Sequence, residues 1–324
     1  MQMIDNKVFE SVKGLFYGQA VGDALGLGTE FMSKAEVLRH YPEGLMGYDQ
    51  IIQDKHRSRW ERGSWTDDTD QFLLICDSIL EEKEVNERAF ARKLREWSSG
   101  SPMGIGMTVH KVVNAPQFVE FPHRAAELIW KMSGKKSAAN GAVMRTSILG
   151  AWEFRELDKV IKNAETIALV THTDPRCVGS AVIVSVLVAG MLTGKVFTVE
   201  EISALGDQYD ERIRPVVELT LKQDITYLRL DDKAFMGYTL KALGAGLWAY
   251  FHAENYLDGL QSVINEGRDA DTNGAVAGSL LGVKFGYSAI PDYLSSGLKN
   301  RALLEKKLKG FLEQIWKFED LRDL

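Results

Sequence analysis

The chain of 324 residues is 45% hydrophobic, which is enough apolar material to bury a full core. Intrinsic disorder is therefore excluded as the general state of the chain. The formal net charge of −6 argues against a broad basic surface for nucleic-acid phosphates, so an intact duplex is not expected as the main ligand.

Cysteine usage and hydropathy predict the compartment. Cys76 and Cys177 both fall within apolar helical patterns, which favours buried free thiols in a reducing environment. Residues 1–12 mix charged and apolar side chains and lack the apolar core of a signal peptide. The most apolar run, residues 177–192, is interrupted by glycine and serine and is shorter than the roughly 20 residues that span a bilayer. We therefore expect a cytoplasmic protein without membrane contact, in which this run forms a central buried helix.

Apolar residues recur at helical spacing in nearly every segment, and no convincing alternating strand pattern is present. The clearest sets are Phe72, Ile75, Cys76 and Ile79; Ile161, Ala164 and Ala168; and Leu304, Leu308, Leu312 and Ile315. We therefore predict an all-α protein. Because no low-complexity linker or fixed-period repeat divides the chain, residues 1–324 are expected to form a single domain. The longest segments without regular structure are expected at residues 29–65 and 100–122, which are rich in turn residues.

The first predicted helix carries glycine at every fourth position. Gly14, Gly18, Gly22 and Gly26 lie along one helical face. Each interior glycine costs about 1 kcal/mol relative to alanine, so close packing or a functional site must offset a cost on the order of 4 kcal/mol. Such a face allows a neighbouring backbone to approach closely, and the same packing would hold residues 27–31 in place.

A cluster of acidic residues precedes the amphipathic run of residues 72–80. Thr66 is a candidate N-cap, and Asp67 and Asp68 are first-turn acids of the kind that the helix dipole favours. Helix capping does not explain the direction of Asp68, which shares a face with the predicted core residue Phe72. A carboxylate on that face needs a cation or several hydrogen-bond donors.

A second pair of acids, Asp269 and Asp271, begins the predicted helix over residues 274–286. If the two clusters meet, four carboxylates and the hydroxyls of Thr66 and Thr272 make an all-oxygen site for a hard cation. Magnesium is the predicted metal, with manganese or calcium as substitutes, and the spacing does not match an EF-hand loop. On spacing alone, ordinary helix capping stays open as the alternative.

Five segments, in order along nearly the whole chain, resemble the ADP-ribosylglycohydrolase family. This family includes the dinitrogenase-reductase-activating glycohydrolase and the ADP-ribosyl-arginine and ADP-ribosyl-serine hydrolases. The segments are GQAVGDALG at 18–26 with Glu30 and Phe31, WTDDT at 65–69, SAANGAVMR at 137–145, THTDP at 171–175 and GRDADTN at 267–273. The resemblance implies a single-domain orthogonal helical bundle of the ADP-ribosylglycohydrolase type.

The resemblance also implies a role for individual residues. Two magnesium ions would be held by Thr66, Asp67, Asp68, Asp269, Asp271 and Thr272, and Glu30, Asp68 and Asp269 would act in catalysis. The diphosphate and ribose would contact Ser137, Ala139, Asn140 and Gly141, and His172 would contact the nucleotide or its ribose. In isolation, the Asn-Gly pair fits an ordinary turn and His172 a core histidine. Some relatives carry an adenine-stacking aromatic residue in place of Ala138 and glycine in place of Lys136, so the adenine partner is unassigned.

The activity that the resemblance implies is magnesium-dependent hydrolysis of the N- or O-glycosidic bond between ADP-ribose and a target, foremost ADP-ribosyl-arginine in protein. The expected partner is an ADP-ribosylated protein, including the targets of an ADP-ribosylating toxin, or a small-molecule conjugate, ahead of a nucleic-acid conjugate. Two alternatives stay open. One is a non-catalytic ADP-ribose-binding or immunity protein of the same fold, and the other is a metal-dependent phosphoesterase on an ADP-ribose-like substrate.

Overall fold

The computed structural model describes residues 6–100 and 102–320 and confirms the predicted all-α class. Within these residues no strand forms, and isolated bridges join Glu30 to Arg268 and Ala139 to Tyr238. The α-helices are α1 (Asn6–Gly26), α2 (Lys34–His40), α3 (Asp67–Glu82), α4 (Glu87–Ser99), α5 (Met107–Val113), α6 (Pro122–Met132), α7 (Leu157–Ala168), α8 (Pro175–Thr193), α9 (Val199–Asp207), α10 (Ile213–Leu219), α11 (Thr239–His252), α12 (Tyr256–Ile264), α13 (Ala270–Phe285), α14 (Asp292–Ser296) and α15 (Arg301–Asp320). Short 3-10 helices lie between them: η1 (Tyr48–Gln50), η2 (Arg57–Arg59), η3 (Ser147–Gly150), η4 (Ile225–Leu228), η5 (Lys233–Phe235) and η6 (Tyr287–Ala289).

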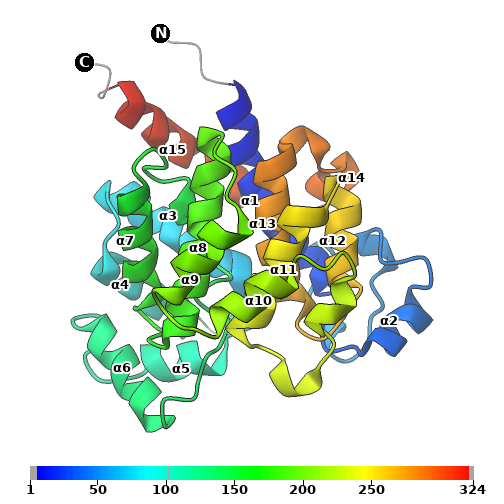
Figure 1. Ribbon diagram of the computed structural model, residues 1–324, viewed down its shortest axis with the longest axis horizontal. Coiled ribbons are helices and arrows are strands. Elements are labelled where there is room, and N and C mark those ends of the chain that lie inside the picture. The colour runs from blue at the N-terminus through cyan, green and yellow to red at the C-terminus, as the bar shows by residue number, and fades with distance from the viewer. Residues whose placement is uncertain (1–5, 101, 321–324) are drawn as a thin grey trace.

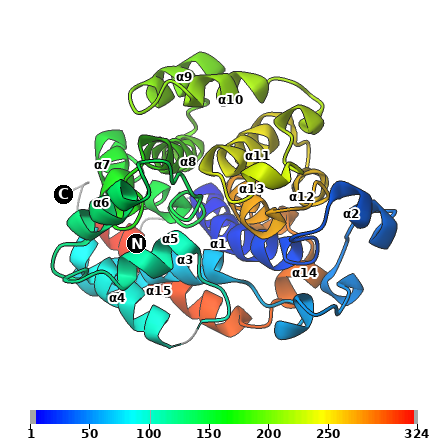
Figure 2. The same cartoon turned by 90° about the horizontal axis from the view of Figure 1, so that it is seen from below.

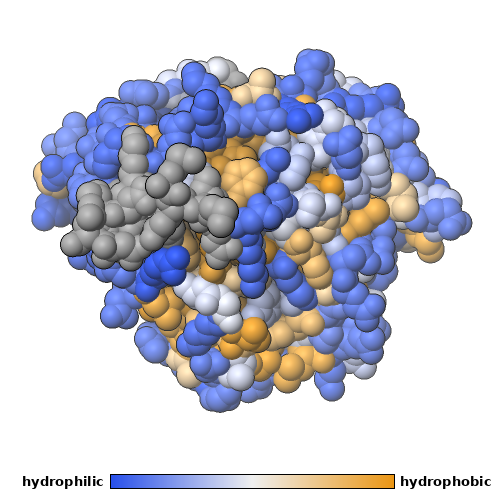
Figure 3. Space-filling view, turned by 90° about the horizontal axis from the view of Figure 1, so that it is seen from above, coloured by the Kyte–Doolittle hydropathy of each residue, from blue (hydrophilic) through white to orange (hydrophobic). Residues whose placement is uncertain are grey.

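Helices α1 and α13 lie at the centre of the bundle, and the other helices surround them (Figure 1). Helix α13 also packs against α11 and α12, while α8 packs against α7, α11 and α13, and α15 against α3 and α1. Seen from below, α9 and α10 lie at one edge of the molecule and α2 at another (Figure 2). Figure 3 shows the opposite face, where hydrophilic residues form most of the rim and hydrophobic residues gather towards the lower half. Helix α1 begins near that face and ends deep in the bundle.

Backbone atoms rather than side chains make the contact between α1 and α13. A Cβ atom added at Gly18 would lie 2.1 Å from the carbonyl oxygen of Gly278, and one at Gly26 would lie 2.2 Å from that of Ala270. The positions that face each other are Gly14 and Gly282, Gly18 and Gly278, Gly22 and Gly274, and Gly26 and Ala270. The two helices are therefore antiparallel, and the end of α1 meets the start of α13. The prediction that the glycine face admits a neighbouring backbone is confirmed.

Helix α8 is the central buried helix that the sequence predicts. By length and composition it is the one helix in the described part of the chain that could cross a membrane. However, 89% of its apolar stretch is buried inside the protein. Cys177 in α8 and Cys76 in α3 are buried free thiols, as expected. The apolar character of α8 is thus accounted for by its packing in the core.

The two segments expected to lack regular structure contain short helices, so that prediction was partly wrong. Helix α2 lies in the first segment and begins with a capping box, in which Ser33 and Glu36 each accept a hydrogen bond from the other's backbone N–H. This S-x-x-E pattern is a recognisable helix start. Helix α5 lies in the second segment, and its N-cap, Gly106, provides no side-chain bond. Burial of Val109 and Val112 orders α5, and such packing has no local sequence signal.

Replacing Gly18 with alanine tests whether backbone contact, rather than helix propensity, governs this position. Propensity alone would stabilise the helix by about 1 kcal/mol. The added methyl group meets a carbonyl oxygen that is fixed in α13, so we expect a net loss of about 2–3 kcal/mol in the free energy of unfolding. Urea denaturation measures this loss. Gly106→Ala is the control, because no atom lies within 4 Å of its added Cβ. A Gly18→Ala variant as stable as the unaltered protein would contradict this account of the contact.

Candidate active site

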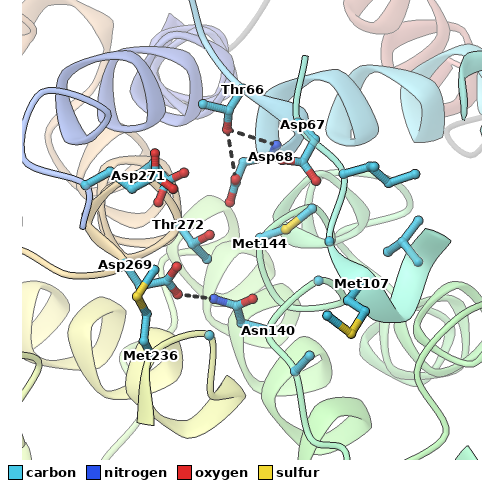
Figure 4. A pocket seen from close by; sticks show the side chains of 18 of the residues that line it. Thr66, Asp67, Asp68, Met107, Asn140, Met144, Met236, Asp269, Asp271 and Thr272 are labelled. Atoms are coloured by element: carbon cyan, nitrogen blue, oxygen red, sulfur yellow. Dashed lines mark hydrogen bonds between the residues drawn. The ribbon is translucent and has the colours of Figure 1, made fainter. Parts of the chain in front are cut away.

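A cavity of about 560 Å³ lies where α1 ends and where α3 and α13 begin (Figure 4). The predicted site residues that line it are Glu30, Thr66, Asp67, Asp68, Ala139, Asn140, Gly141, His172, Asp269, Asp271 and Thr272. Ser137 lies instead in the wall of a neighbouring cavity of about 690 Å³. The two cavities share the residues Met107, Thr108 and His172. The structure therefore brings together residues from five distant segments of the sequence.

The start of α3 is fixed onto α1 by a buried carboxylate. Asp23 accepts hydrogen bonds from the backbone N–H of Thr66 (2.9 Å) and from both the backbone N–H (3.0 Å) and the hydroxyl (2.6 Å) of Thr69. Thr66 is the N-cap, as predicted: its hydroxyl accepts from the N–H of Asp68 and donates to an oxygen of that carboxylate at 3.0 Å. Asp23 belongs to the first family motif, but sequence reasoning assigned no role to it. Only the folded chain shows that its carboxylate lies beside the N–H groups at the start of α3 and accepts hydrogen bonds from them.

The start of α13 is held by the segment that follows α1. The Thr29 hydroxyl donates to the Ile264 carbonyl at 2.6 Å, and the Phe31 N–H donates to the Arg268 carbonyl at 2.6 Å. Asn140 donates through its side-chain amide to Asp269, which is the contact drawn in Figure 4. The glycine contact and these bonds place Glu30, Asp269 and the first turn of α13 at one end of the cavity. The prediction that close packing of α1 also holds residues 27–31 is confirmed.

Two residues that sequence reasoning missed hold Glu30. His56 Nε2 lies 2.6 Å from Glu30 Oε2. The buried side chain of Arg57 donates to the carbonyl oxygens of Gly28 (2.8 Å) and Glu30. Both residues come from the segment that we expected to be irregular, and no local pattern marks them as contacts of Glu30.

Burial and mutual repulsion disfavour ionisation of the acids around the cavity. Asp68 and Asp271 are 2% and 6% exposed, and burial, reinforced by the neighbouring carboxylates, raises the pKa of each well above its ordinary value. Burial likewise raises the pKa of Asp67 to about 6 and that of Asp269 to about 7. Asp23 also has a pKa raised by burial, to about 7, although its hydrogen bonds act in the opposite direction. The five side chains therefore gather acidic groups whose ionisation the folded protein disfavours, although the charge of Arg145 acts on Asp67.

The donors in this region suit a hard divalent cation. Three oxygen atoms here are buried and have no hydrogen-bond partner: Oδ1 of Asp68, Oδ1 of Asp271 and Oδ1 of Asn273. Carboxylate and hydroxyl oxygens are the ligands that magnesium, manganese and calcium prefer. Across residues 6–100 and 102–320, however, no three acidic, histidine or cysteine side chains are already arranged to hold one ion. The chemistry of the donor set fits a cation, and the side chains must shift to enclose one.

The opposite wall of the cavity is a tight turn against His172. Asn140 donates its backbone N–H to the Gly237 carbonyl at 3.0 Å. A Cβ atom on Gly141 would lie 2.8 Å from His172 Cε1, so only glycine fits beside the imidazole. His172 is 3% exposed, and burial, with the charge of Arg145 adding to it, lowers its pKa to about 3. The imidazole is therefore neutral at physiological pH, and its ring separates the two cavities.

The fold and the cavity define a class of all-helical protein in which two acidic helix N-termini meet beside an Asn-Gly turn. The model of the ADP-ribosylglycohydrolase family matches residues 5–321, and the chain belongs to this family. Membership places it among the glycohydrolases.

Named relatives and a solved structure are similar over most of their lengths. The ADP-ribosylarginine hydrolase Tri1 of Serratia proteamaculans is 23% identical, with 96% of this chain and 80% of that protein covered. The glycohydrolase of ADP-ribosyl-dinitrogen reductase from Rhodospirillum rubrum is 25% identical, with 90% of each chain covered. A solved structure described as an ADP-ribosylglycohydrolase-related protein complex has a TM-score of 0.73 at 24% identity, over 96% of this chain and 99% of that one. This last likeness shows a shared fold.

The lowered pKa of His172 predicts a pH-dependent contribution to stability. In the unfolded chain the imidazole takes up a proton below pH about 6.5, whereas in the folded chain it does so only near pH 3. Folding therefore loses about 1.4 kcal/mol for each pH unit below 6.5 through this residue. When the pH is lowered from 7.5 to 5, we expect the unaltered protein to lose about 2 kcal/mol more of its unfolding free energy than His172→Gln loses. Urea denaturation at the two pH values measures both losses. Equal losses in the two proteins would show that the folded imidazole titrates normally.

Proposed function

We propose that the protein hydrolyses the glycosidic bond between ADP-ribose and a modified target in a magnesium-dependent reaction, and that ADP-ribosyl-arginine in protein is its foremost substrate. The observation that carries the proposal is the pair of buried, unpartnered carboxylate oxygens of Asp68 and Asp271, which face one cavity from two helix N-termini. Family membership supports the glycohydrolase class, and the name of the Serratia relative supports arginine as the linkage.

The residues that would hold the metal are those of the two helix starts: Thr66, Asp67, Asp68, Asp269, Asp271 and Thr272. Bound there, divalent cations would orient the ribose hydroxyls and lower the pKa of a water molecule. Each helix N-terminus carries a positive partial charge of about one half, which opposes cation binding. Four carboxylates outweigh two such partial charges, so the net field at the cavity favours a cation.

Other residues of the cavity would position the substrate and move protons. Glu30 borders the cavity, and its contacts with His56 and Arg57 hold it there, so its carboxylate is placed to accept a proton from water. Asn140 fixes Asp269 through its amide and leaves the Gly141 backbone open to close approach by a diphosphate. Because nearly all the acids lie at the helix starts, a mechanism with two free carboxylates, as in ordinary glycosidases, is not favoured.

The neighbouring cavity gives room for the rest of the nucleotide. It adjoins the acidic cavity at His172, and most of its lining surface is apolar, with Ile129 and Trp130 of α6 among the lining residues. An adenine ring can be buried against such a surface. We propose that ADP-ribose spans both cavities, with its distal ribose at the acidic helix starts and its base against α5 and α6. This placement supplies an adenine site that does not depend on an aromatic residue at Ala138.

The proposed activity is tested by release of free ADP-ribose from ADP-ribosylated arginine, serine and nucleic-acid substrates, each with magnesium and with a chelator. We expect magnesium-dependent release from the arginine conjugate. Asp271→Asn should reduce turnover at least about a hundredfold, because a metal ion beside the bond that breaks stabilises the transition state by several kcal/mol. Asp292→Asn is the matched control, since Asp292 is also a first-turn acid but is exposed on α14.

Other outcomes of this assay identify the alternatives. Formation of AMP or ribose phosphate would contradict glycosidic hydrolysis and indicate a phosphoesterase. Tight binding of ADP-ribose without release from any conjugate would indicate a non-catalytic binding protein. Full turnover by Asp271→Asn would show that the helix starts are not the active site.

Metal binding itself can be measured through stability, without any substrate. A cation that binds the folded protein alone adds about 2.7 kcal/mol at a hundredfold excess over its Kd. We therefore expect magnesium chloride to raise the thermal midpoint relative to sodium chloride of equal ionic strength. Asp68→Asn should raise the midpoint of the metal-free protein, because it removes a buried charge, and should diminish the gain from magnesium. Equal gains in this variant and the unaltered protein would place the bound cation elsewhere.

A further inference from the structure

Arg145 is a buried cation that lines neither cavity, but its partner Thr171 lies in the wall of the second one. Its side chain is fully buried, and its guanidinium lies 4.9 Å from the centre of the Phe90 ring. It donates to Oε1 of Gln71 and, at 2.6 Å, to the hydroxyl oxygen of Thr171. No described carboxylate forms an ion pair with it, so burying this charge carries a cost that its neutral partners offset only in part. A purely structural position would be served as well by an uncharged side chain.

The guanidinium determines the orientation of both partners, because it has donors and no acceptor. Since the amide oxygen of Gln71 faces Arg145, its NH₂ group faces the other way, and it donates to Oδ2 of Asp67 at 3.1 Å. Since the Thr171 oxygen accepts from Arg145, the Thr171 hydrogen is free to donate. The oxygen of this hydroxyl lies 2.8 Å from Nδ1 of His172, which can accept the hydrogen when Nδ1 carries no proton.

A Thr171 hydroxyl that donates to Nδ1 would set the tautomer of His172. A neutral imidazole whose Nδ1 accepts a hydrogen bond carries its proton on Nε2. Nε2 has no protein partner in the part of the chain that the structure describes, although His172 is only 3% exposed. It lies against Gly141, where a Cβ would be 3.1 Å from it, and the ring lines both cavities. An N–H on Nε2 would therefore be available to an acceptor oxygen of a ligand in the cavities that His172 lines.

We propose that Arg145 is a positioning residue that orients two donors at once: the Gln71 amide towards Asp67 and, through Thr171, the Nε2–H of His172 towards an acceptor oxygen of the bound nucleotide. The identity of the ligand as ADP-ribose rests on the proposed function, whereas the orientation of the three side chains does not. His172 then acts as a fixed hydrogen-bond donor to a phosphate or ribose oxygen. It neither gives up nor takes up a proton during the reaction.

The tautomer tests the relay directly. Nitrogen-15 NMR of the unaltered protein, with the His172 signals assigned by comparison with His172→Gln, should show Nε2 protonated and Nδ1 unprotonated between pH 6 and pH 8. In Thr171→Val, which removes the hydroxyl in nearly the same volume, the Nδ1 resonance should shift, and in Thr171→Ser it should return towards its original position. A proton on Nδ1 in the unaltered protein, or an Nδ1 resonance unmoved in Thr171→Val, would overturn the proposal.

The consequence for binding is measured by calorimetry with ADP-ribose. We expect Thr171→Val to weaken binding about tenfold, which corresponds to about 1.4 kcal/mol and is in the range of one hydrogen bond. Thr171→Ser should recover most of this affinity. In turnover the loss should appear chiefly as a raised KM, because the donor contacts the nucleotide and not the bond that breaks. Thr220→Val is the control for removing a buried threonine hydroxyl, since that group bonds only to the Val217 carbonyl of its own helix.

The two proposals fail in different ways. If Thr171→Val binds ADP-ribose as tightly as the unaltered protein does, the positioning role is overturned even though the enzyme is active. If the unaltered protein does not bind ADP-ribose at all, the proposed function is contradicted. The NMR result then still decides whether the Thr171 hydroxyl, to which Arg145 donates, sets the tautomer of His172.

Discussion

The direct backbone contact between α1 and α13 is the constraint on which the site depends. Four glycines of α1 face three glycines and Ala270 of α13, so the end of α1 and the start of α13 lie against each other. The segment after α1 then bonds to the residues just before α13, and Asp23 near the end of α1 caps α3. Both acidic helix starts are therefore positioned by the same helix. The cost of glycine in a helix interior is offset by this packing.

The acidic cavity is electrostatically unfavourable for folding. Asp68 and Asp271 are buried, and burial and repulsion from neighbouring carboxylates together oppose their ionisation. Such an arrangement persists only where other interactions hold it in place. Here the holding elements are neutral and rigid: the glycine contact, the Thr66 cap and the Asn140 amide. These contacts therefore offset the cost of burying the acids at the two helix starts.

Sequence patterns predicted much of this arrangement, because several of its causes are local. Glycine at every fourth position predicted the close contact of α1, and the helical face of Asp68 predicted a buried carboxylate. Thr66 was recognisable as an N-cap from its type and place. The family resemblance, borne out by the family match, brought the turn at Asn140 and His172 into the same site. That the chain forms one domain and that it binds magnesium stay predictions.

Other features depend on contacts between distant residues and could not be read locally. Nothing in the sequence around His56 and Arg57 shows that they hold Glu30, because that contact exists only after the intervening segment folds back over the end of α1. Arg145 was visible as a motif residue, but its partners Gln71 and Thr171 come from two other segments. Helix α5 is likewise ordered by burial and lacks a side-chain cap. The supporting residues of the site, more than its acids, were therefore hidden from sequence reasoning.

The most direct test of the central claim compares the two ends of the glycine contact. Gly26→Ala and Gly14→Ala introduce the same kind of clash, 2.2 Å from the Ala270 carbonyl and 2.0 Å from the Gly282 carbonyl, but only the first lies beside the acidic helix starts. Titration calorimetry with magnesium, at a temperature where both variants are folded, should show affinity lowered by about tenfold or more in Gly26→Ala, a loss of about 1.4 kcal/mol, and nearly unchanged in Gly14→Ala. Equal affinities in the two variants would contradict the claim that this contact positions the site.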